Sequence, residues 1–396
     1  MPADRLRVLH VEVGGDFGGS LRALEVYLAR SRHPNIEHDV LLYYPTAGAE
    51  RLRAHARRVW SLYSRPPRPP RGRGATVAEL GRSRLAAGVD DLHDWKNLAR
   101  GLPTAWRLAR VLREGGYGAV HVNNTWTYQA PTVLAALLAR VPVVSHARNP
   151  VRRGSVSRLL LRLVDQLVAD SDSLRRALDG WNAGVPIRTC YNCVELRAPD
   201  PAVVSKLRQS LAPSGTLLIG SVGRLDDQKG YEHLVHAARL VANTEPRARF
   251  AVVGDGPRRR ELQRLIDDLG LGERFSLCGF RSGVTDFIAA LDLFVSSSRW
   301  EGLPLVVVEA MLLGKRVVVT DVGGNRELVD SGRTGLLVRP DDPQALSEAM
   351  LSMLDPEGSP ALDVDRVRRA AAAIADPVAN AAAFDDVLGD VARRAS

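Results

Sequence analysis

The sequence predicts an α/β protein built from two doubly wound, parallel-sheet domains. Short apolar segments rich in β-branched residues alternate with segments of helical spacing, a pattern typical of parallel sheets covered by helices. The alternation breaks near residue 198 and restarts after residue 213, and 396 residues are more than one core usually supports. We therefore expect domains over residues 1–198 and 199–375, and a helix over residues 376–396 that returns to the first domain.

In the first half, apolar segments predict strands over residues 6–13, 40–44, 119–122, 141–145 and 167–169. A glycine-rich turn over residues 14–19 precedes a helical pattern, and Ser20 is placed to cap that helix. Residues 64–95 contain the stretch RPPRPPRGRG, whose prolines exclude a helix or a central strand. We expect residues 64–95 to form a long basic loop.

The second half repeats the alternation. Strands are predicted over residues 217–222, 250–253, 293–296, 317–320 and 335–338, with helices over 232–241, 259–269 and 305–313 between them. Pro199, Pro201 and Pro213 mark the linker between the halves. Two such sheets facing across a cleft bind ligands at the carboxyl ends of their strands, so functional residues are expected in the loops that follow strands.

The positive charge of the chain is concentrated in its first half. Residues 1–200 hold 30 Lys and Arg against 18 Asp and Glu, whereas residues 201–396 hold 24 against 27. A basic half fits an anionic membrane surface, an anionic acceptor or nucleic acid. Solvated arginines without a partner are an equally simple explanation.

Several classes of protein are not supported by the sequence. There is no run of 18 apolar residues and no apolar segment after Met1, so we expect neither a membrane span nor a secretory signal, and a cytoplasmic location. Cys190 and Cys193 form a lone C-x-x-C without the second pair that a zinc site needs. No cofactor and no metal are predicted.

The segment GRLDDQKG, residues 223–230, follows a predicted strand and precedes a helix. Its two cations, Arg224 and Lys229, are bracketed by glycines that permit a sharp turn. A helix start adds free N–H groups and a positive dipole end. These features suit a diphosphate, although a solvated turn with two surface cations is an alternative of equal weight.

The segment EGLPLVVVE, residues 301–309, follows the predicted strand 293–296 and runs into the predicted helix 305–313. Pro304 suits the first helical position, and the backbone at Gly302 and Leu303 offers N–H groups. Glu301 before the helix and Glu309 inside it suit hydrogen bonds from neutral hydroxyls of a sugar and a ribose. The alternative is a core helix with one structural glutamate.

These segments together resemble the retaining GT-B glycosyltransferases of family 4, whose pattern is G-R-x(4)-K-G followed by E-x(7)-E. The resemblance extends through SSSRWEGLPLVVVEAMLLGKRVVVTDVGGNRELV and a GLLV strand, and covers most of residues 217–345. The first half resembles the family more weakly, through GDFGGS, VPVVSHAR and DSDSLRR. The basic stretch 64–95 matches nothing in it.

The resemblance implies two facing Rossmann-like domains and a role for each matching residue. Arg224 and Lys229 would bind the donor diphosphate, Glu309 the ribose, and Glu301 the transferred sugar. Gly302, Leu303 and Pro304 would lie at the donor, and the backbone around Phe280 and Val284 would hold the base. From the first half, Gly19 would approach the phosphate and His146 would lie beside the sugar and acceptor.

Two further features of the first half are ambiguous. Asp170-Ser171-Asp172 spells the D-x-D of metal-dependent glycosyltransferases, but its place before a helix favours an N-cap at Ser171 or Asp172. His121 and Asn124 lie near a predicted strand end, where they either contact the acceptor or are core residues.

The predicted function is therefore metal-independent transfer of a hexosyl group, with retention, from a UDP- or GDP-sugar to a glycan, lipid-linked or small-molecule acceptor. A nucleotide-sugar epimerase of the same architecture is the alternative. We expect no nucleic-acid partner, because no binding module is recognisable. Peripheral contact with the inner membrane face is expected through the basic half, with residues 65–84 as the candidate segment.

Overall fold

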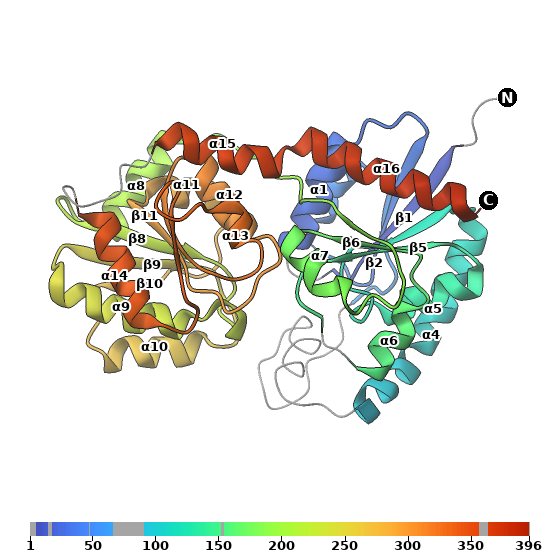
Figure 1. The fold of residues 1–396 in the computed structure, drawn as a ribbon, viewed down its shortest axis with the longest axis horizontal. Coiled ribbons are helices and arrows are strands. Elements are labelled where there is room, and N and C mark those ends of the chain that lie inside the picture. The colour runs from blue at the N-terminus through green and yellow to red at the C-terminus, as the bar shows by residue number, and fades with distance from the viewer. Residues whose placement is uncertain are drawn as a thin grey trace. The chain divides into compact units, whose positions relative to one another are not determined.

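The computed structural model describes residues 5–14, 18–46, 48–65, 91–151, 154–355 and 363–395, with side chains of the first helix after residue 90 described from Trp95. Most of the basic segment 64–95, including nearly all of residues 65–84, lies outside these residues. The chain forms two compact units, Met1–Cys193 with Asp376–Ser396, and Val194–Ala375 (Figure 1). No helix among the described residues is long and apolar enough to cross a membrane.

The first unit is a seven-stranded sheet of order β3-β2-β1-β4-β5-β6-β7, in which every pair is parallel. Its strands are β1 Leu6–Glu12, β2 Ile36–Leu42, β3 Arg58–Ser61, β4 Ala119–Val122, β5 Val143–Ala147, β6 Gln166–Ala169 and β7 Ile187–Thr189. Its helices are α1 Gly19–Arg30, α2 Ala49–Arg53, α4 Asp91–Gly115, α5 Ala130–Ala139, α6 Ser155–Leu161, α7 Asp172–Asp179 and α16 Pro377–Ala395.

Alternation along the strands gives this sheet two apolar faces. Leu9 and Val11 of β1 face a core with α4, α5 and α6, while Val8 faces a core with α1 and α16. Figure 1 shows α1 and α16 on one side of the sheet and α4, α5 and α6 on the other. The last helix of the chain is therefore part of the first unit's core, through buried residues such as Phe384 and Leu388.

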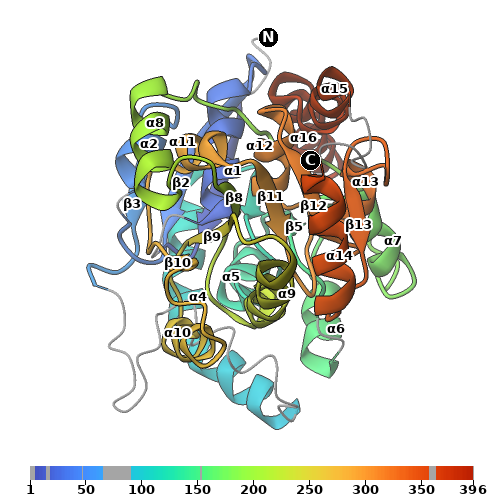
Figure 2. The ribbon, with the colours of Figure 1, turned by 90° about the vertical axis from the view of Figure 1, so that its left-hand side faces the viewer.

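The second unit is a six-stranded parallel sheet of order β10-β9-β8-β11-β12-β13 (Figure 2). Its strands are β8 Leu217–Val222, β9 Ala248–Val253, β10 Phe275–Leu277, β11 Leu293–Ser296, β12 Arg316–Thr320 and β13 Leu336–Val338. Its helices are α8 Pro201–Leu211, η1 Asp227–Lys229, α9 Tyr231–Thr244, α10 Arg259–Asp268, α11 Val284–Ala290, α12 Leu305–Leu312, α13 Asn325–Leu328, α14 Pro343–Leu354 and α15 Val364–Ala375. The predicted fold class, two doubly wound parallel-sheet units, is confirmed.

Some predictions of individual helix ends and strands are wrong, and one is confirmed. Ser20 is not the cap of α1: the helix begins at Gly19, Gly18 is the capping residue, and no side chain caps it. Residues 91–95 are not loop, because they open α4, a 25-residue helix that contains Pro103. The strand β3 was not predicted, because its four residues carry no alternating pattern. Ser171 does cap α7, and its side chain accepts a hydrogen bond from the Leu174 N–H.

Candidate functional site

The loop 223–230 links β8 to α9 in the second unit, and close backbone packing holds its shape. Gly230 has a left-handed φ of +56°, and a Cβ there would lie 2.4 Å from the carbonyl oxygen of Ser297. The turn at Gly254 backs the other end, where a Cβ would lie 1.8 Å from the carbonyl oxygen of Gly223. Side chains larger than hydrogen are therefore excluded at Gly230 and at Gly254, the residue that packs against Gly223.

Arg224 and Lys229 each meet a carboxylate. The Arg224 guanidinium donates from Nε to Asp226 Oδ2 at 2.9 Å, and its Nη2 lies 2.8 Å from the same oxygen. Lys229 Nζ lies 2.6 Å from Glu301 Oε1. The side chains of Arg224 and Lys229 keep 25% and 19% of their surface exposed, so both cations stay within reach of a ligand at the strand ends.

The Lys229–Glu301 ion pair brings the two sequence motifs into contact. β8 and β11 are neighbours in the sheet, so the loops that follow them emerge side by side. Glu301 also accepts hydrogen bonds from Ser298 Oγ at 2.6 Å and from Gln228 Nε2 at 3.3 Å. Glu301 is only 6% exposed, and its three donors hold the carboxylate in one orientation.

The helix after Glu301 begins at Leu305, as in the predicted range 305–313, but Pro304 does not take the first helical position. Pro304 is the capping residue of α12, and Leu305 is the first helical residue. Gly302, Leu303 and Pro304 are buried in the turn before it, and Gly302 accepts a hydrogen bond from the Gly324 N–H at 2.7 Å. Glu309 lies within α12 and is fully buried.

Two other expected residues of this unit lie after β10. Phe280 is 70% exposed, and Val284 is the first residue of α11. The preceding Gly279 has φ +70°, and its carbonyl accepts a hydrogen bond from the Gly254 N–H at 2.9 Å. The same turn that supports the Gly223 loop therefore also holds the segment before Phe280.

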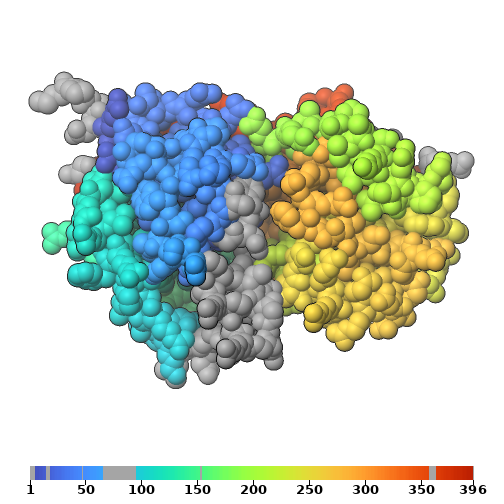
Figure 3. All heavy atoms as spheres, turned by 180° about the vertical axis from the view of Figure 1, so that it is seen from behind, coloured from blue at the N-terminus to red at the C-terminus, as the bar shows by residue number. Residues whose placement is uncertain are grey.

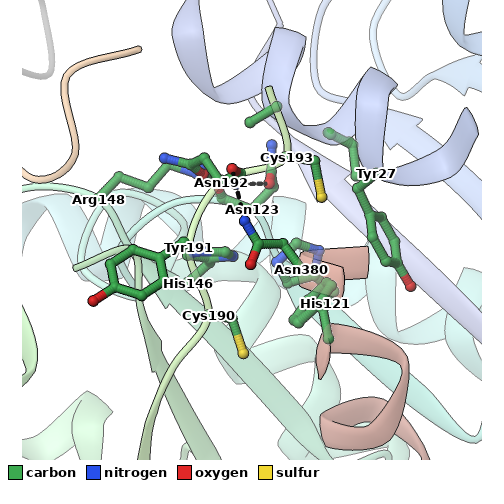
Figure 4. Close-up of a pocket in the computed structure, with 13 residues that line it drawn as sticks. Tyr27, His121, Asn123, His146, Arg148, Cys190, Tyr191, Asn192, Cys193 and Asn380 are labelled. Atoms are coloured by element: carbon green, nitrogen blue, oxygen red, sulfur yellow. Dashed lines mark hydrogen bonds between the residues drawn. The ribbon is translucent and has the colours of Figure 1, made fainter. Parts of the chain in front are cut away.

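In the first unit, His146 on β5 lines a cavity of about 20 Å³ beside His121, Asn123, Arg148 and Asn192 (Figure 4). This is room for about one water molecule. Both ring nitrogens of His146 have no hydrogen-bond partner among the residues that the structure describes. Burial, and then the nearby Arg148, lower the pKa of His146 well below its usual value, so the ring is neutral at pH 7.

Arg148 and Glu12 form a polar cluster at the strand ends of this unit that the sequence did not reveal. Arg148 donates from Nη2 to Asn123 Oδ1 at 2.8 Å and also bonds Asn192 Oδ1. Glu12 accepts from the Val13 N–H and the Asn123 Nδ2, each at 2.8 Å, and from Asn124 Nδ2. Burial raises the pKa of Glu12 despite these hydrogen bonds.

The remaining candidates of the first unit take different positions. His121 is buried under α16 and bonds His10. Gly19 is exposed at the start of α1, close to residues 15–17, which lie outside the described part.

Asp172 pairs with Arg175 and Arg176, and no cluster of three metal-binding side chains occurs among the described residues. Cys190 and Cys193 are free, and burial raises the pKa of each thiol to about 12.

Comparison with known proteins identifies the family. Residues 205–371 match the family described as "Glycosyl transferases group 1". A lipopolysaccharide core biosynthesis mannosyltransferase of Rhizobium meliloti is 31% identical over 251 residues, which are 61% of this chain and 68% of that protein. The UDP-Gal:alpha-D-GlcNAc-diphosphoundecaprenol alpha-1,3-galactosyltransferase of Escherichia coli is 27% identical over 280 residues, 65% of this chain and 72% of that protein.

The fold is shared with a solved structure over nearly the whole chain. The crystal structure of Anabaena HepE in complex with UDP and glucose superposes with a TM-score of 0.78, covers 97% of this chain and 99% of that chain, and is 24% identical. This likeness supports the predicted GT-B architecture. With two thirds of the mannosyltransferase covered at 31% identity, the chain belongs to the group 1 glycosyl transferases and is a glycosyltransferase.

Proposed function

We propose that the chain transfers a sugar from a nucleotide-sugar donor to a glycan, lipid-linked or small-molecule acceptor, with retention at the anomeric carbon as in family 4. A UDP- or GDP-sugar is the proposed donor. The observation that carries the proposal is the 2.6 Å contact of Lys229 Nζ with Glu301 Oε1, which joins two motifs beside Arg224 on adjacent strand ends. The HepE structures with UDP and with UDP-glucose support a nucleotide-sugar donor.

In this proposal Arg224 and Lys229 bind the donor diphosphate. Arg224 offers a planar pair of donors and Lys229 a point charge, and both leave their carboxylate partners when the more strongly charged diphosphate enters. The turn before α12 adds the backbone N–H groups of Gly302 and Leu303, whereas Pro304, which has no N–H, only caps the helix that begins at Leu305.

The other candidate residues bind the uncharged parts of the donor, which are the sugar, the ribose and the base. The carboxylate of Glu301 accepts from sugar hydroxyls and that of Glu309 from the ribose, because carboxylate oxygens only accept hydrogen bonds. Phe280, which is largely exposed, and the backbone at Val284 hold the base. Gly19, which has no side chain, permits close approach of the first unit's backbone to the phosphate.

Chemically, the bond from the anomeric carbon to the diphosphate oxygen breaks and a bond to the acceptor oxygen forms on the same face. In the proposed reaction the acceptor proton passes to the departing diphosphate oxygen, no covalent intermediate forms, and the two cations take the role that a metal has in other glycosyltransferases. Arg224 and Lys229 stabilise the charge that develops on the leaving group. His146, neutral at pH 7, polarises or orients the sugar and acceptor rather than attacking.

On the acceptor side we propose Asn124 and His121. Asn124 follows β4, is half-buried, and its amide donates to Glu12 at 3.0 Å. His121 is buried within β4, so its influence reaches the acceptor through His146.

Substitution of the two cations tests the donor assignment. Arg224→Ala and Lys229→Ala should each lower turnover by about a hundredfold or more, because each removes a group that stabilises transition-state charge. Arg239→Ala, an exposed arginine on α9, is the matched control and should keep full activity. Unchanged turnover in both site variants would refute the diphosphate assignment.

An epimerase of the same architecture makes a different prediction. It would convert the donor alone, whereas a transferase requires an acceptor. The relatives reported above are transferases and do not favour an epimerase. Incubating donor without acceptor and separating the sugars distinguishes the two, and a new sugar nucleotide would overturn our proposal.

We also propose peripheral contact with an anionic membrane surface, made by helix α4. Trp95, Leu102 and Trp106 are 45%, 54% and 71% exposed and recur along one side of the helix. Exposed cations accompany them: Lys96, Arg100, Arg107, Arg110 and Arg113. Part of α4, in cyan, is visible at the surface of the first unit in Figure 3.

The apolar surface continues onto the end of α5. Arg113 Nη2 donates to the Leu138 carbonyl at 2.8 Å, and Leu137 and Leu138 are 55% and 47% exposed. Tryptophan with flanking arginine is the composition of helices that lie at lipid headgroups, and each cation near an anionic surface contributes about 1 kcal/mol.

Flotation with vesicles of phosphatidylglycerol or phosphatidylcholine tests this contact. The double variant Leu102→Ser with Trp106→Ser should float several-fold less with the anionic vesicles at low salt. Val378→Ser, a change at an equally exposed apolar residue of α16, should float as the unchanged protein does. Equal flotation of both variants would exclude α4 as the membrane contact.

A further inference from the structure

Four neighbouring strands of the first unit each carry a histidine on the same face of the sheet. The residues are His38 on β2, His10 on β1, His121 on β4 and His146 on β5, here called the histidine row. His10 pairs directly with His121, whereas His38 pairs with Val8 and His146 with Val168. Side chains alternate along strands, so this register points all four rings toward α1 and α16.

Three members of the row form a continuous hydrogen-bonded chain. His10 Nδ1 lies 2.9 Å from His121 Nδ1, and His10 Nε2 lies 3.0 Å from His38 Nδ1. His38 Nε2 lies 3.0 Å from Ser31 Oγ. Ser31 Oγ in turn lies 2.9 Å from both carboxylate oxygens of Asp385 on α16.

The carboxylate sets the direction of every hydrogen bond in this chain. A carboxylate only accepts, so Ser31 donates its single proton to Asp385. His38 must then donate from Nε2 to the Ser31 oxygen. Tyr27 donates to the same carboxylate at 2.6 Å and does not interrupt the chain.

Each neutral imidazole holds one N–H, and the remaining protons follow in order. Burial lowers the pKa of His10, His38 and His121, so all three rings are neutral at pH 7. With its proton on Nε2, His38 accepts at Nδ1 from His10 Nε2. His10 then accepts at Nδ1 from His121 Nδ1, and His121 is left with a bare lone pair on Nε2.

That lone pair lies beside the candidate catalytic histidine. The His121 and His146 ring centroids are 5.7 Å apart, and both rings line the same small cavity (Figure 4). His121 Nε2 and both His146 nitrogens have no hydrogen-bond partner among the described residues. A single water in a cavity of about 20 Å³ suffices to join an N–H of His146 to His121 Nε2.

We propose that the Asp385–Ser31–His38–His10–His121 chain fixes the tautomer of His121, and that His121 is a positioning residue for His146. The acceptor nitrogen of His121 draws the His146 proton to the side of the ring that faces the cavity. The other His146 nitrogen then presents a lone pair. This second step rests on the proposed function of His146, whereas the tautomers themselves do not.

Nitrogen-15 NMR of the full chain with labelled histidine tests the tautomers directly, because a bare ring nitrogen and a protonated one resonate far apart. The His121 signals are assigned by their loss in His121→Gln. We expect Nδ1 protonated and Nε2 bare. A protonated Nε2 in the unchanged protein would overturn the proposal whatever the enzyme does.

Two variants and a control test the role of the carboxylate. Asp385→Asn introduces an amide that can donate to Ser31 and so reverse the chain, and Ser31→Ala cuts it. Each should move part or all of the His121 proton to Nε2. Tyr27→Phe removes the other donor to Asp385 and should leave the His121 tautomer unchanged. An unchanged His121 tautomer in both Asp385→Asn and Ser31→Ala would refute the chain.

Kinetics test the link to His146 separately. Asp385→Asn and Ser31→Ala should lower kcat by roughly tenfold, because a misplaced His146 proton weakens the contact of His146 with the sugar and acceptor. KM for the donor should change less than about twofold, because the diphosphate site lies in the other unit. Altered tautomers with unchanged kcat would overturn the positioning role, and an absence of any transferase activity would instead refute the proposed function.

Discussion

The second unit places its candidate site on two loops that each carry their chemistry within nine residues, whereas the first unit assembles its own from strands and a helix spread over the whole chain. The second unit presents cations paired with carboxylates at its strand ends, Arg224 with Asp226 and Lys229 with Glu301. The first presents neutral rings and amides in a buried setting, with Arg148 held by Asn123 and Asn192. We expect a charged ligand group at the partly exposed cations of the second unit, and an uncharged group at the buried hydrogen-bonding side chains of the first.

Lowering the pH should destabilise the first unit much more than the second, and this is the largest difference that we expect between them. Burial holds the pKa of His10, His121 and His146 well below the ordinary value of 6.5. Below pH 6.5 the unfolded chain binds protons that the folded unit does not, so the free energy of unfolding falls as pH falls. Each histidine kept neutral costs about 1.4 kcal/mol per pH unit.

Thermal unfolding between pH 7.5 and 5 measures this effect. The transition of the first unit should move down steeply, and that of the second unit should move much less. Replacing His10 by Gln removes one titrating ring and should flatten the slope. A pH-independent first transition would contradict the buried, neutral histidine row.

The next largest effect should follow from a change in the backbone of the loop 223–230 in the second unit. Gly230→Ala forces a Cβ to within 2.4 Å of the Ser297 carbonyl at φ +56°, which combines backbone strain with a clash. We expect a loss of about 2–4 kcal/mol in unfolding free energy and loss of the thermal stabilisation by donor. Denaturant titration and thermal shift with UDP- and GDP-sugars measure both.

Gly270→Ala is the matched control. Gly270 has a similar φ of +65° with no atom within 4 Å of the added Cβ. It should lose only about 1–2 kcal/mol and retain donor stabilisation. If the two variants behave alike, the contact with Ser297 does not shape the loop.

A smaller effect is expected at the buried polar cluster of the first unit. Glu12→Ala leaves the amides of Asn123 and Asn124 and the Val13 N–H without their acceptor, at a cost of about 1–3 kcal/mol. Urea unfolding of the first unit measures it. Glu114→Ala, at an exposed glutamate of α4, should leave the midpoint nearly unchanged.

The sequence pattern predicted what depends on neighbours in the chain. Strand and helix periodicity was sufficient for the fold class, and the motifs around Arg224 and Glu301 were visible because each loop carries its own glycines and charges. Helix α4 was not predicted, and residues 91–95 were assigned to a loop, because the preceding proline-rich stretch and Pro103 argue against a helix. Ser20 failed as a cap because α1 starts one residue earlier, at Gly19.

The contacts within the histidine row could not be predicted from patterns along the chain. The sequence places His10, His121 and His146 in or beside predicted strands, and alternation assigns each to one face of its strand. Which strands are neighbours, and in what register, depends on pairing across the sheet, so the 2.9 Å contact of His10 with His121 could not be foreseen. Asp385, which orients the chain, lies 354 residues from Ser31.

By itself, then, the sequence determined the two-unit α/β fold, the family resemblance and the residues of the second unit's loops, because local periodicity and short motifs encode them. Only the tertiary structure decided which loops meet, which cations are paired, and which polar groups are buried. Those properties arise from sheet order and from the return of α16 to the first sheet, where Asp385 reaches Ser31 and Tyr27. Burial and hydrogen bonding between distant segments are properties of packing, and no short stretch of sequence contains them.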